Sequence, residues 1–252
     1  MNNIKKLVLV STILLTSACA TSIHRSDTDA DPYEGINRKI FSFNDSVYEN
    51  VFFPIARGYR KVTTPFIRER VNSFVANMNE PISAVNHLLQ LEPLGLVKNV
   101  VRVAINTTLG LGGMFDVAQG WGIEPDTTNF NQTLASWCVA DGPYLVVPFV
   151  GGSSVRGVTG MVADAAADPV FWMTYNDANY EAKITYPYMA VKYTAKAENY
   201  MDLYKDFKQN SVDFYATMRS AYLQSQRKLK CRFAPEETTE AYDFDFDEDW
   251  EE

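Results

Sequence analysis

The sequence predicts a mainly α-helical protein that is held at a membrane by its N-terminus and has no membrane-spanning helix in its mature part. Apolar residues recur every three or four positions through most of residues 31–233, which is the spacing of amphipathic helices. The apolar run near the N-terminus is too short to cross a bilayer, and no later stretch reaches about 18 apolar residues. The 252 residues are 46% hydrophobic, which excludes a disordered chain.

The N-terminus has the three parts of a secretory signal. Two lysines precede an apolar run at residues 7–15, and the small residues 16–18 then lead to Cys19. A cysteine directly after small residues resembles the lipobox of bacterial lipoproteins, in which the thiol is acylated and becomes the first residue of the mature chain. We therefore predict a lipoprotein signal peptide at residues 1–18, lipid attachment at Cys19 and a lipidated tether at residues 19–30. Ordinary secretion with an incidental Cys19 is the alternative.

The folded body is expected to begin with a helix. Asp31 is suited to cap this helix, Pro32 fits the first helical position, and Glu34 stands where it would complete a capping box. Apolar residues then follow at helical spacing as far as Pro54, where the helix is expected to end.

Further helices are expected at residues 71–78, 81–89 and 93–105, and the last two each begin with a proline. A longer amphipathic helix is expected at residues 193–222, where aromatic and aliphatic residues recur among Lys and Asp, with room for a break near Asn210. The sequence therefore consists of helical segments before and after a middle region of different character.

The predicted helix at residues 93–105 is apolar over most of its surface. Lys98 and Arg102 are four residues apart and share one face. A helix of this length is closer to one leaflet than to the whole hydrocarbon core, which is about 30 Å thick. Two interpretations fit: a buried helix of a soluble core, which the segment taken alone favours, and a helix that faces lipid.

The middle region, residues 106–169, is rich in Gly and Pro, and no strict alternation indicates an extended sheet. Five glycines crowd residues 110–122, but no Lys-Ser or Lys-Thr follows, so a phosphate-binding loop is excluded. Either a flexible apolar hairpin at a membrane or lipid path, or a buried turn, fits this composition. The candidate lipid-path or membrane-facing residues are Leu109, Leu111, Met114 and Phe115.

Catalytic machinery is not predicted. Of the two histidines, His24 lies in the tether and His87 in a predicted helix, so a nucleophile–histidine pair would rest on His87 alone. Neither a Gly-x-Ser-x-Gly motif nor His or Cys pairs at metal-binding spacing are present, so we expect no metal and no cofactor. Four aspartates near Gly or Pro are expected to cap helices and turns: Asp116, Asp141, Asp164 and Asp168.

Two cysteines follow Cys19 in the mature chain. In an oxidising compartment Cys138 and Cys231 form either a disulfide or two buried free thiols, and both states fit the sequence. A disulfide that closed so long a loop would stabilise the fold considerably.

Charge is unevenly distributed along the chain. Ten of the 31 acidic residues lie beyond Ala234, where there is no Lys or Arg. The other 21 acids are balanced by the 21 Lys and Arg that remain without Lys5 and Lys6 of the signal, so the body is neutral and a nucleic-acid binder is disfavoured. Residues 234–252 are expected to be an acidic disordered tail, which either recruits a basic partner or serves solubility.

Ordered motifs over nearly the whole mature chain resemble one family. The match begins with Asp31-Pro32-Tyr33-Glu34-Gly35-Ile36-Asn37-Arg38 and continues through Glu80-Pro81, Gln132-Thr133-Leu134, Gly142-Pro143-Tyr144-Leu145 and Asp168-Pro169. The chain is similar to the MlaA (VacJ) lipoproteins of Gram-negative outer membranes. No Asp follows Cys19, which by the same resemblance favours the outer membrane over the inner one.

The resemblance implies a ring-like helical body, residues 31–233, lying in the inner leaflet of the outer membrane and facing the periplasm. It also implies an amphipathic channel and a trimeric porin as scaffold. The expected function, without enzymatic activity, is to remove mislocalised phospholipids from the outer leaflet and pass them to a soluble periplasmic carrier, which maintains lipid asymmetry. A lipid-cleaving hydrolase and a structural surface lipoprotein are the alternatives.

Overall fold

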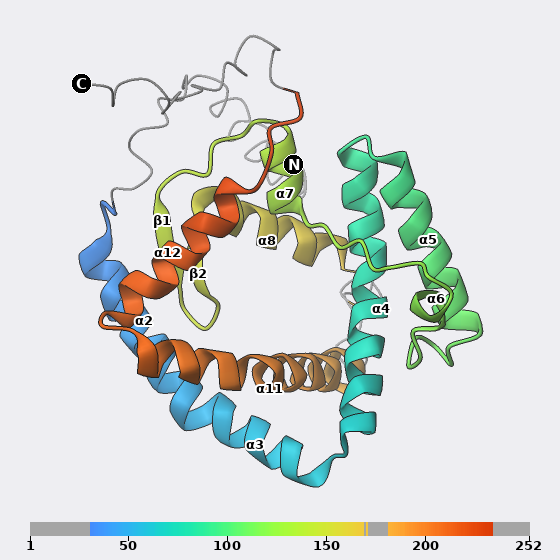
Figure 1. Ribbon diagram of the computed structural model, residues 1–252, viewed down its shortest axis with the longest axis horizontal. Coiled ribbons are helices and arrows are strands. Elements are labelled where there is room, and N and C mark those ends of the chain that lie inside the picture. Colours follow the sequence, from blue (N-terminus) through green and yellow to red (C-terminus); the bar gives the residue numbers. More distant parts are fainter. Residues whose placement is uncertain (1–30, 169, 171–180, 234–252) are drawn as a thin grey trace, which may run out of the picture.

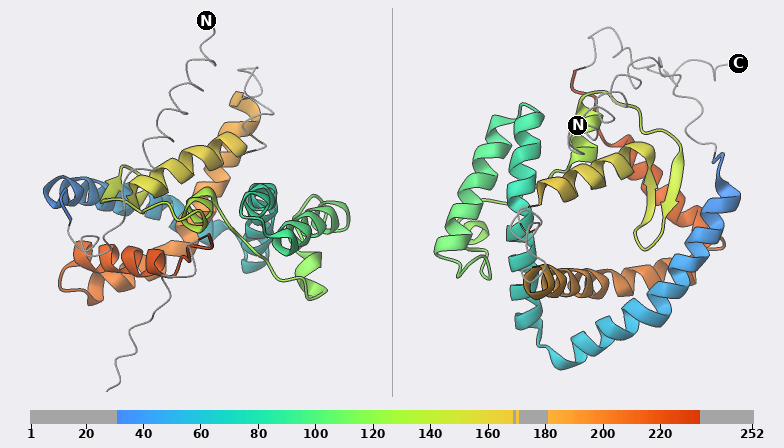
Figure 2. Two further views of the ribbon diagram at one scale, coloured as in Figure 1. Left: turned by 90° about the horizontal axis from the view of Figure 1, so that it is seen from above. Right: turned by 180° about the vertical axis from the view of Figure 1, so that it is seen from behind.

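The helices form a ring around a central opening (Figure 1), which is also visible from behind (Figure 2). This computed structural model describes residues 31–168, 170 and 181–233, and the predicted mainly α-helical fold is confirmed. The described elements include α2 (Glu34–Val47), the π-helical turn η3 (Tyr48–Phe52), α3 (Phe53–Val62), α4 (Pro65–Leu89), α5 (Pro93–Thr108), α6 (Val117–Gly120), α7 (Phe130–Ser136), β1 (Tyr144–Val147), β2 (Gly151–Ser154), α8 (Val155–Ala167), η4 (Glu181–Thr185), α11 (Tyr186–Asn210) and α12 (Phe214–Arg227). The predicted signal peptide, Cys19, the predicted tether and the predicted acidic tail lie outside the described residues.

The first helix begins later and extends further than the sequence predicts. Asp31 precedes it and accepts hydrogen bonds from the Tyr33 amide (3.2 Å) and the Asn37 side chain (2.9 Å), so it orders the preceding turn instead of capping the helix. Pro54 does not end the helical backbone, because η3 precedes the proline and α3 continues to Val62. The wider π turn accommodates Pro54, which lacks an amide hydrogen and whose ring would crowd the preceding turn of an α-helix.

Two buried asparagines of α2 bind the edge of β1. Asn37 donates to the Tyr144 carbonyl (3.0 Å) and accepts from the Val146 amide (2.9 Å). Asn44, further along the same face, forms the same pair of contacts with the backbone at the end of the strand (2.9 and 2.7 Å). Because the side chains of α2 satisfy the backbone of β1, a short antiparallel hairpin of β1 and β2 is stable without a third strand.

A single helix, α4, replaces the two helices predicted at residues 71–78 and 81–89. Thr64 caps its N-terminus with a side chain that accepts a hydrogen bond from the Ile67 amide (3.3 Å), and Pro81 lies inside the helix. Prolines usually interrupt helices, but α4 packs against α5, α7 and α11, and this packing outweighs the local preference. The prediction that Pro81 begins a new helix is therefore wrong.

The hairpin of α4 and α5 has polar residues inside and apolar residues outside. Arg102 is fully buried, and its guanidinium pairs with Glu80 (2.7 Å) and Asp116 (2.8 Å) and donates to the Ile123 carbonyl (2.5 Å). Burial alone would raise the pKa of Asp116, but hydrogen bonds from Arg102 and neighbouring groups outweigh this effect and leave it below its usual value. The buried residues of α5 are Gly95, Asn99, Arg102 and Asn106.

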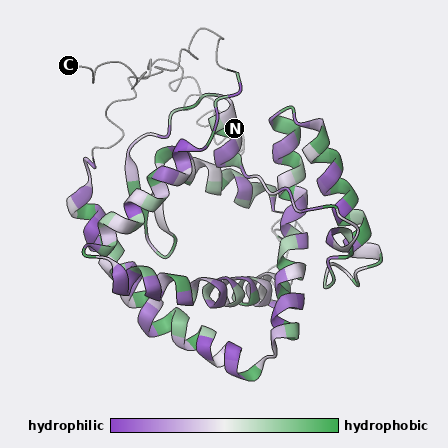
Figure 3. Ribbon diagram, viewed as in Figure 1, coloured by the Kyte–Doolittle hydropathy of each residue, from purple (hydrophilic) through white to green (hydrophobic). Residues whose placement is uncertain are grey.

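The apolar residues of α5 lie on its outer surface. Leu94 is 85% exposed, Val97 59% and Val100 53%, and α5 is hydrophobic along much of its length (Figure 3). The interpretation of residues 93–105 as a buried helix of a soluble core is therefore wrong. Among the described residues, no helix is both long and apolar enough to span a membrane.

The Gly- and Pro-rich middle region contains more regular structure than its sequence indicates. Its only described strands are the four-residue β1 and β2, so the absence of an extended sheet is confirmed for the described residues. The sequence did not reveal α8, which is capped by Ser154, whose hydroxyl accepts a hydrogen bond from the Gly157 amide (3.0 Å). The predicted break in the last long helix is confirmed at residues 211–213, and Asp213 caps α12.

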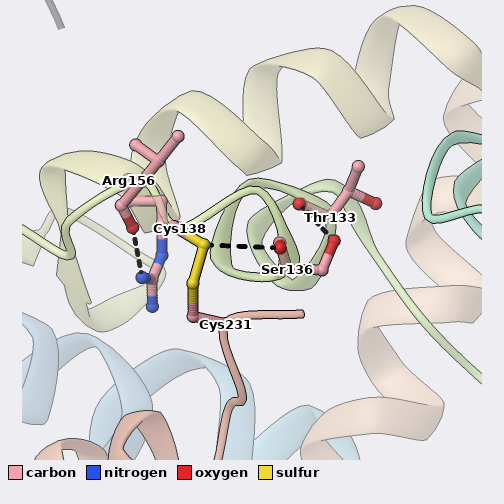
Figure 4. The surroundings of a disulfide bond; sticks show 6 residues. Thr133, Ser136, Cys138, Arg156 and Cys231 are labelled. Atoms are coloured by element: carbon pink, nitrogen blue, oxygen red, sulfur yellow. Dashed lines mark hydrogen bonds between the residues drawn. A yellow bond between two sulfur atoms is a disulfide. The ribbon is translucent and has the colours of Figure 1, made fainter. Parts of the chain in front are cut away.

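The chain closes on itself at α12. Near the start of α12, Asp213 pairs with Arg38 of α2 (2.7 Å) and the Tyr215 hydroxyl donates to Asp31. Beyond its end, Cys231 forms a disulfide with Cys138, with 4.7 Å between the Cα atoms (Figure 4). Of the two cysteine states that fit the sequence, the structure has the disulfide.

Candidate functional site: a central cavity

A cavity of about 1160 Å³ lies within the ring. Its walls come from α2, η3, the first residue of α3, α4, the β1–β2 hairpin, α8, α11 and α12, together with residues 127–129. This volume is above the range of roughly 300–1,000 Å³ that is usual for small-molecule pockets. Elements from both halves of the chain are needed to enclose it, so the site is a property of the closed ring.

One wall of the cavity is aromatic. Tyr48, Phe53 and Tyr204 line it and pack against one another, with ring centres 5.3 Å apart for Phe53 and Tyr204 and 5.5 Å apart for Tyr48 and Tyr204. The Tyr204 hydroxyl donates to Asp45 (3.0 Å), and burial raises the pKa of this tyrosine. Aromatic side chains with a polar tip provide an apolar surface without leaving a buried polar group unpaired.

Another part of the cavity lining consists of polar and charged side chains on α4, α8 and α11. Lys192 lines the cavity, donates to the Asn79 side chain (3.2 Å), and its ammonium nitrogen lies 5.5 Å from the centre of the Tyr188 ring. Burial lowers the pKa of Lys192, and the negative charge of Asp168 opposes this change. Lys196, one turn further along α11, also lines the cavity. The cavity therefore has two lysines and two aspartates, Asp164 and Asp168, among the residues that line it.

The lining residues of α11 form a stripe that the sequence already contains. Five of them recur every four residues along the helix: Tyr188, Lys192, Lys196, Tyr200 and Tyr204. Met189, Tyr193 and Ala197 line the cavity beside them. Sequence reasoning recognised Tyr200 and Tyr204 as part of an amphipathic helix, but it missed Tyr188 and the two lysines. The spacing of the lysines on the aromatic face was the signal that could have identified them.

A family model described as "MlaA lipoprotein" matches residues 29–229. The chain belongs to the MlaA lipoprotein family. "Intermembrane phospholipid transport system lipoprotein MlaA" of Haemophilus influenzae is 31% identical, with 86% of each chain covered. The Escherichia coli protein of the same name is 32% identical over 67% of this chain and 68% of that protein. An uncharacterised protein of Rickettsia typhi is 40% identical over 76% of this chain and 74% of its own length.

A solved structure also matches the fold. It is described as "Structural basis for maintenance of bacterial outer membrane lipid asymmetry", and the superposition has a TM-score of 0.67 at 29% sequence identity. The match covers 78% of this chain and 97% of the other. The ring and its cavity thus belong to an MlaA-family chain that matches a solved structure over most of its length.

In this MlaA-family chain, the four sequence-predicted lipid-path residues lie away from the cavity. Leu109 (60% exposed), Leu111 and Met114 are on the outside of the turn after α5, and none of the four is among the cavity-lining residues. Phe115 is partly buried, and the Arg70 guanidinium lies 4.6 Å from the centre of its ring. Because none of the four residues lines the cavity, the structure does not support a role for them in the lipid path. A membrane-facing role is a proposal.

His87 is built into the fold. Its side chain is buried, Nδ1 lies 3.0 Å from Glu92 and Nε2 lies 3.1 Å from the Asp126 carbonyl. A Cβ atom at Gly95 would come within 2.3 Å of the ring, so glycine is required where α5 packs against His87. Nδ1 is engaged by the turn between α4 and α5 and Nε2 by the segment between α6 and α7, which is the arrangement of a structural histidine.

The aspartates predicted as caps have structural partners. Asp116 caps α6 through the Gln119 amide (3.0 Å), and Asp164 accepts from the Phe130 amide (3.1 Å). Asp141 accepts from the Ser154 hydroxyl, and Asp168 accepts from the Val170 amide (2.8 Å). Asp164 and Asp168 additionally border the cavity, and sequence reasoning did not anticipate this. In the part of the chain that the structure describes, no group of three or more His, Cys, Asp or Glu could hold a metal ion.

Proposed function

We propose that this chain is a lipid-anchored outer-membrane protein that takes mislocalised phospholipids from the outer leaflet and passes them through its central cavity to a soluble periplasmic carrier. The cavity of about 1160 Å³, with aromatic and cationic walls, is the observation that carries this proposal. Membership of the MlaA family supports it, since the relatives from two organisms are named as phospholipid transport lipoproteins.

The chemistry of the walls suits an intact phospholipid. A charged headgroup crosses hydrocarbon only at a large desolvation cost. Lys192 and Lys196 would stabilise the phosphate, while Tyr48, Phe53 and Tyr204 offer an apolar surface to the acyl chains. Each end of the lipid would thus meet groups of its own polarity along the path, which lowers the barrier without any bond being made or broken.

The exterior supports a position within one leaflet. Leu94, Val97 and Val100 would be costly to expose to water, whereas in lipid they would face a medium of their own polarity. The buried cation of the α4–α5 hairpin, Arg102, is paired with Glu80 and Asp116 inside the protein, as charged residues within a membrane usually are. We place this surface in the inner leaflet of the outer membrane, beside a trimeric porin as scaffold, with the cavity mouth toward the periplasm.

A reconstituted transfer assay tests the proposal. The lipidated protein is placed with a porin in proteoliposomes that contain labelled phospholipid, and intact lipid reaching an acceptor is measured. Lys192→Glu should slow transfer by about tenfold or more, because a carboxylate then replaces a cation that faces the phosphate. Lys61→Glu, at the exposed end of α3 and outside the cavity lining, is the matched control and should leave transfer unchanged. Equal rates for both variants would contradict passage through the cavity.

The same assay separates the two alternatives. A hydrolase would release fatty acid or lysophospholipid in step with transfer, and His87→Ala would abolish that release. We expect neither product, because both ring nitrogens of His87 are engaged within the fold. A structural lipoprotein would leave outer-leaflet phospholipid unchanged when its gene is deleted, whereas a transporter that removes phospholipid predicts an increase.

A further inference from the structure

Helix α12 is a wall of the cavity whose two ends are held in different ways. Met218, Ala221, Tyr222 and Ser225 of α12 line the cavity. At its beginning, Asp213 pairs with Arg38 of α2 through two hydrogen bonds of 2.7 and 3.2 Å. Beyond its end, the chain is fixed covalently by Cys231, six residues after the last lining residue.

The segment after α12 is fixed at one small area on the rim of the ring. The disulfide joins Cys231 to Cys138, which lies two residues after the end of α7 (Figure 4). The Arg232 amide donates to the Ser136 carbonyl (3.0 Å). The Arg232 side chain reaches the turn between α4 and α5, where it pairs with Glu92 (2.7 Å) and donates to the Gln90 carbonyl (3.3 Å).

Noncovalent contacts at this end of α12 are partly exposed. The Arg232–Glu92 pair is 46% and 39% exposed, and such pairs contribute little in water. Gln226 accepts from Arg156 of α8 and from Asn131 of α7, each at 3.1 Å. Because these bonds are weak individually, the covalent bond is the strongest constraint that keeps the end of α12 against α7 and α8.

The disulfide is also accessible from solution. Cys231 is exposed, while Cys138 is partly buried. A dithiol in the periplasm could therefore approach the sulfur of Cys231, with little need for prior unfolding.

We propose that the Cys138–Cys231 disulfide is a redox-sensitive latch on the α12 wall of the cavity. A thiolate of a dithiol reductant attacks one sulfur and forms a mixed disulfide, and the second thiolate of the reductant then displaces the protein thiolate. The reductant leaves as a disulfide, and Cys138 and Cys231 each take up a proton as thiols. The segment after α12 is released, the end of α12 moves away from α7 and α8, and the cavity widens there. The effect on lipid passage rests on the function proposed above, but the movement of α12 does not.

Fluorescence energy transfer in the full-length lipidated protein tests the movement. A ketone-bearing amino acid at Gln224 of α12 and another at Thr159 of α8 carry the two dyes, and both positions are exposed and outside the cavity lining. Dithiothreitol should lower the transfer efficiency of this pair, and reoxidation should restore it. A second pair at Arg57 of α3 and Asp206 of α11 is the control and should not change. An unchanged Gln224–Thr159 pair, or an equal loss in the control pair, would overturn the latch.

Phospholipid transfer from proteoliposomes tests the consequence. Dithiothreitol should speed transfer by the native protein, and Cys138→Ser/Cys231→Ser should transfer at the higher rate with or without it. Movement of α12 without any change in transfer rate would overturn redox control of the cavity. If no lipid is transferred in either redox state, the proposed function fails, while the fluorescence result still decides whether the latch opens.

Discussion

Arg102 is a cation that the α4–α5 hairpin buries completely, between Glu80 and Asp116. Removal of one partner from such a pair leaves uncompensated charge in the interior. Arg102→Met should lower the free energy of unfolding by about 3–5 kcal/mol, measured by denaturant titration. Lys98→Met, one turn earlier on α5, removes a partly exposed ion pair in which Nζ lies 4.0 Å from the Asp126 carboxylate. This change should lower the free energy of unfolding by about 1 kcal/mol or less. Equal losses in the two variants would contradict the structural role of the buried cation.

Cys19 is the residue through which the protein is expected to be anchored, and it lies outside the described residues. Cys19→Ala removes the thiol that would carry the lipid. We expect uncleaved precursor or protein lost from the outer-membrane fraction, measured by mass spectrometry and membrane fractionation. Native mass and unchanged fractionation in the variant would show that the protein is secreted without a lipid anchor.

At the scale of elements, the exposed apolar surface of α5 is the part of the ring that we propose faces lipid. Val97→Asp/Val100→Asp places two carboxylates on this exposed apolar surface. A charged side chain in hydrocarbon costs about 2.5–3.5 kcal/mol, so binding of the unlipidated Cys19→Ser chain to liposomes should weaken at least tenfold. The melting temperature should change little, because both valines are exposed. Unchanged liposome binding would indicate that this surface faces water or a protein partner.

The acidic tail is an element whose role the charge pattern alone suggests. Deletion of residues 235–252 removes ten uncompensated acids. If the tail recruits a basic surface of the periplasmic carrier, the deletion should weaken carrier binding at low salt and have little effect at high salt. Surface plasmon resonance at low and high ionic strength measures the carrier affinity of both chains. The same affinity for both chains at low salt would assign the tail to solubility alone.

At the scale of the whole molecule, the disulfide closes a loop of sequence separation 93. The chain-entropy model assigns about 4–5 kcal/mol to a cross-link of this length. Cys138→Ser/Cys231→Ser should therefore lower the free energy of unfolding by an amount of this order, measured by denaturant titration under oxidising conditions. The reduced native protein is the control and should match the variant. A variant as stable as the oxidised native protein would show that the covalent bond constrains the unfolded chain very little.

Several features could be predicted from sequence because they depend on residues close together in the chain. The proline at residue 93 and the apolar residues after it predicted α5, and the aromatic spacing with its break near Asn210 predicted α11 and α12. Pro54 and Pro81 were misjudged for the opposite reason. Each lies in helical backbone that a π turn or packing against distant helices maintains.

The sequence by itself determined the helical class, the membership of the MlaA family and the pattern of each amphipathic helix. Periodicity reveals that a helix has two faces, but it does not reveal which face turns inward. On α5, Gly95, Asn99, Arg102 and Asn106 form a polar stripe in an apolar helix. Only the tertiary structure decided that this stripe is buried, because its partners come from α4 and from the chain after α5. The cavity and the pairing of Cys138 with Cys231 were likewise decided by ring closure, which brings together residues far apart in the chain whose contacts no local pattern encodes.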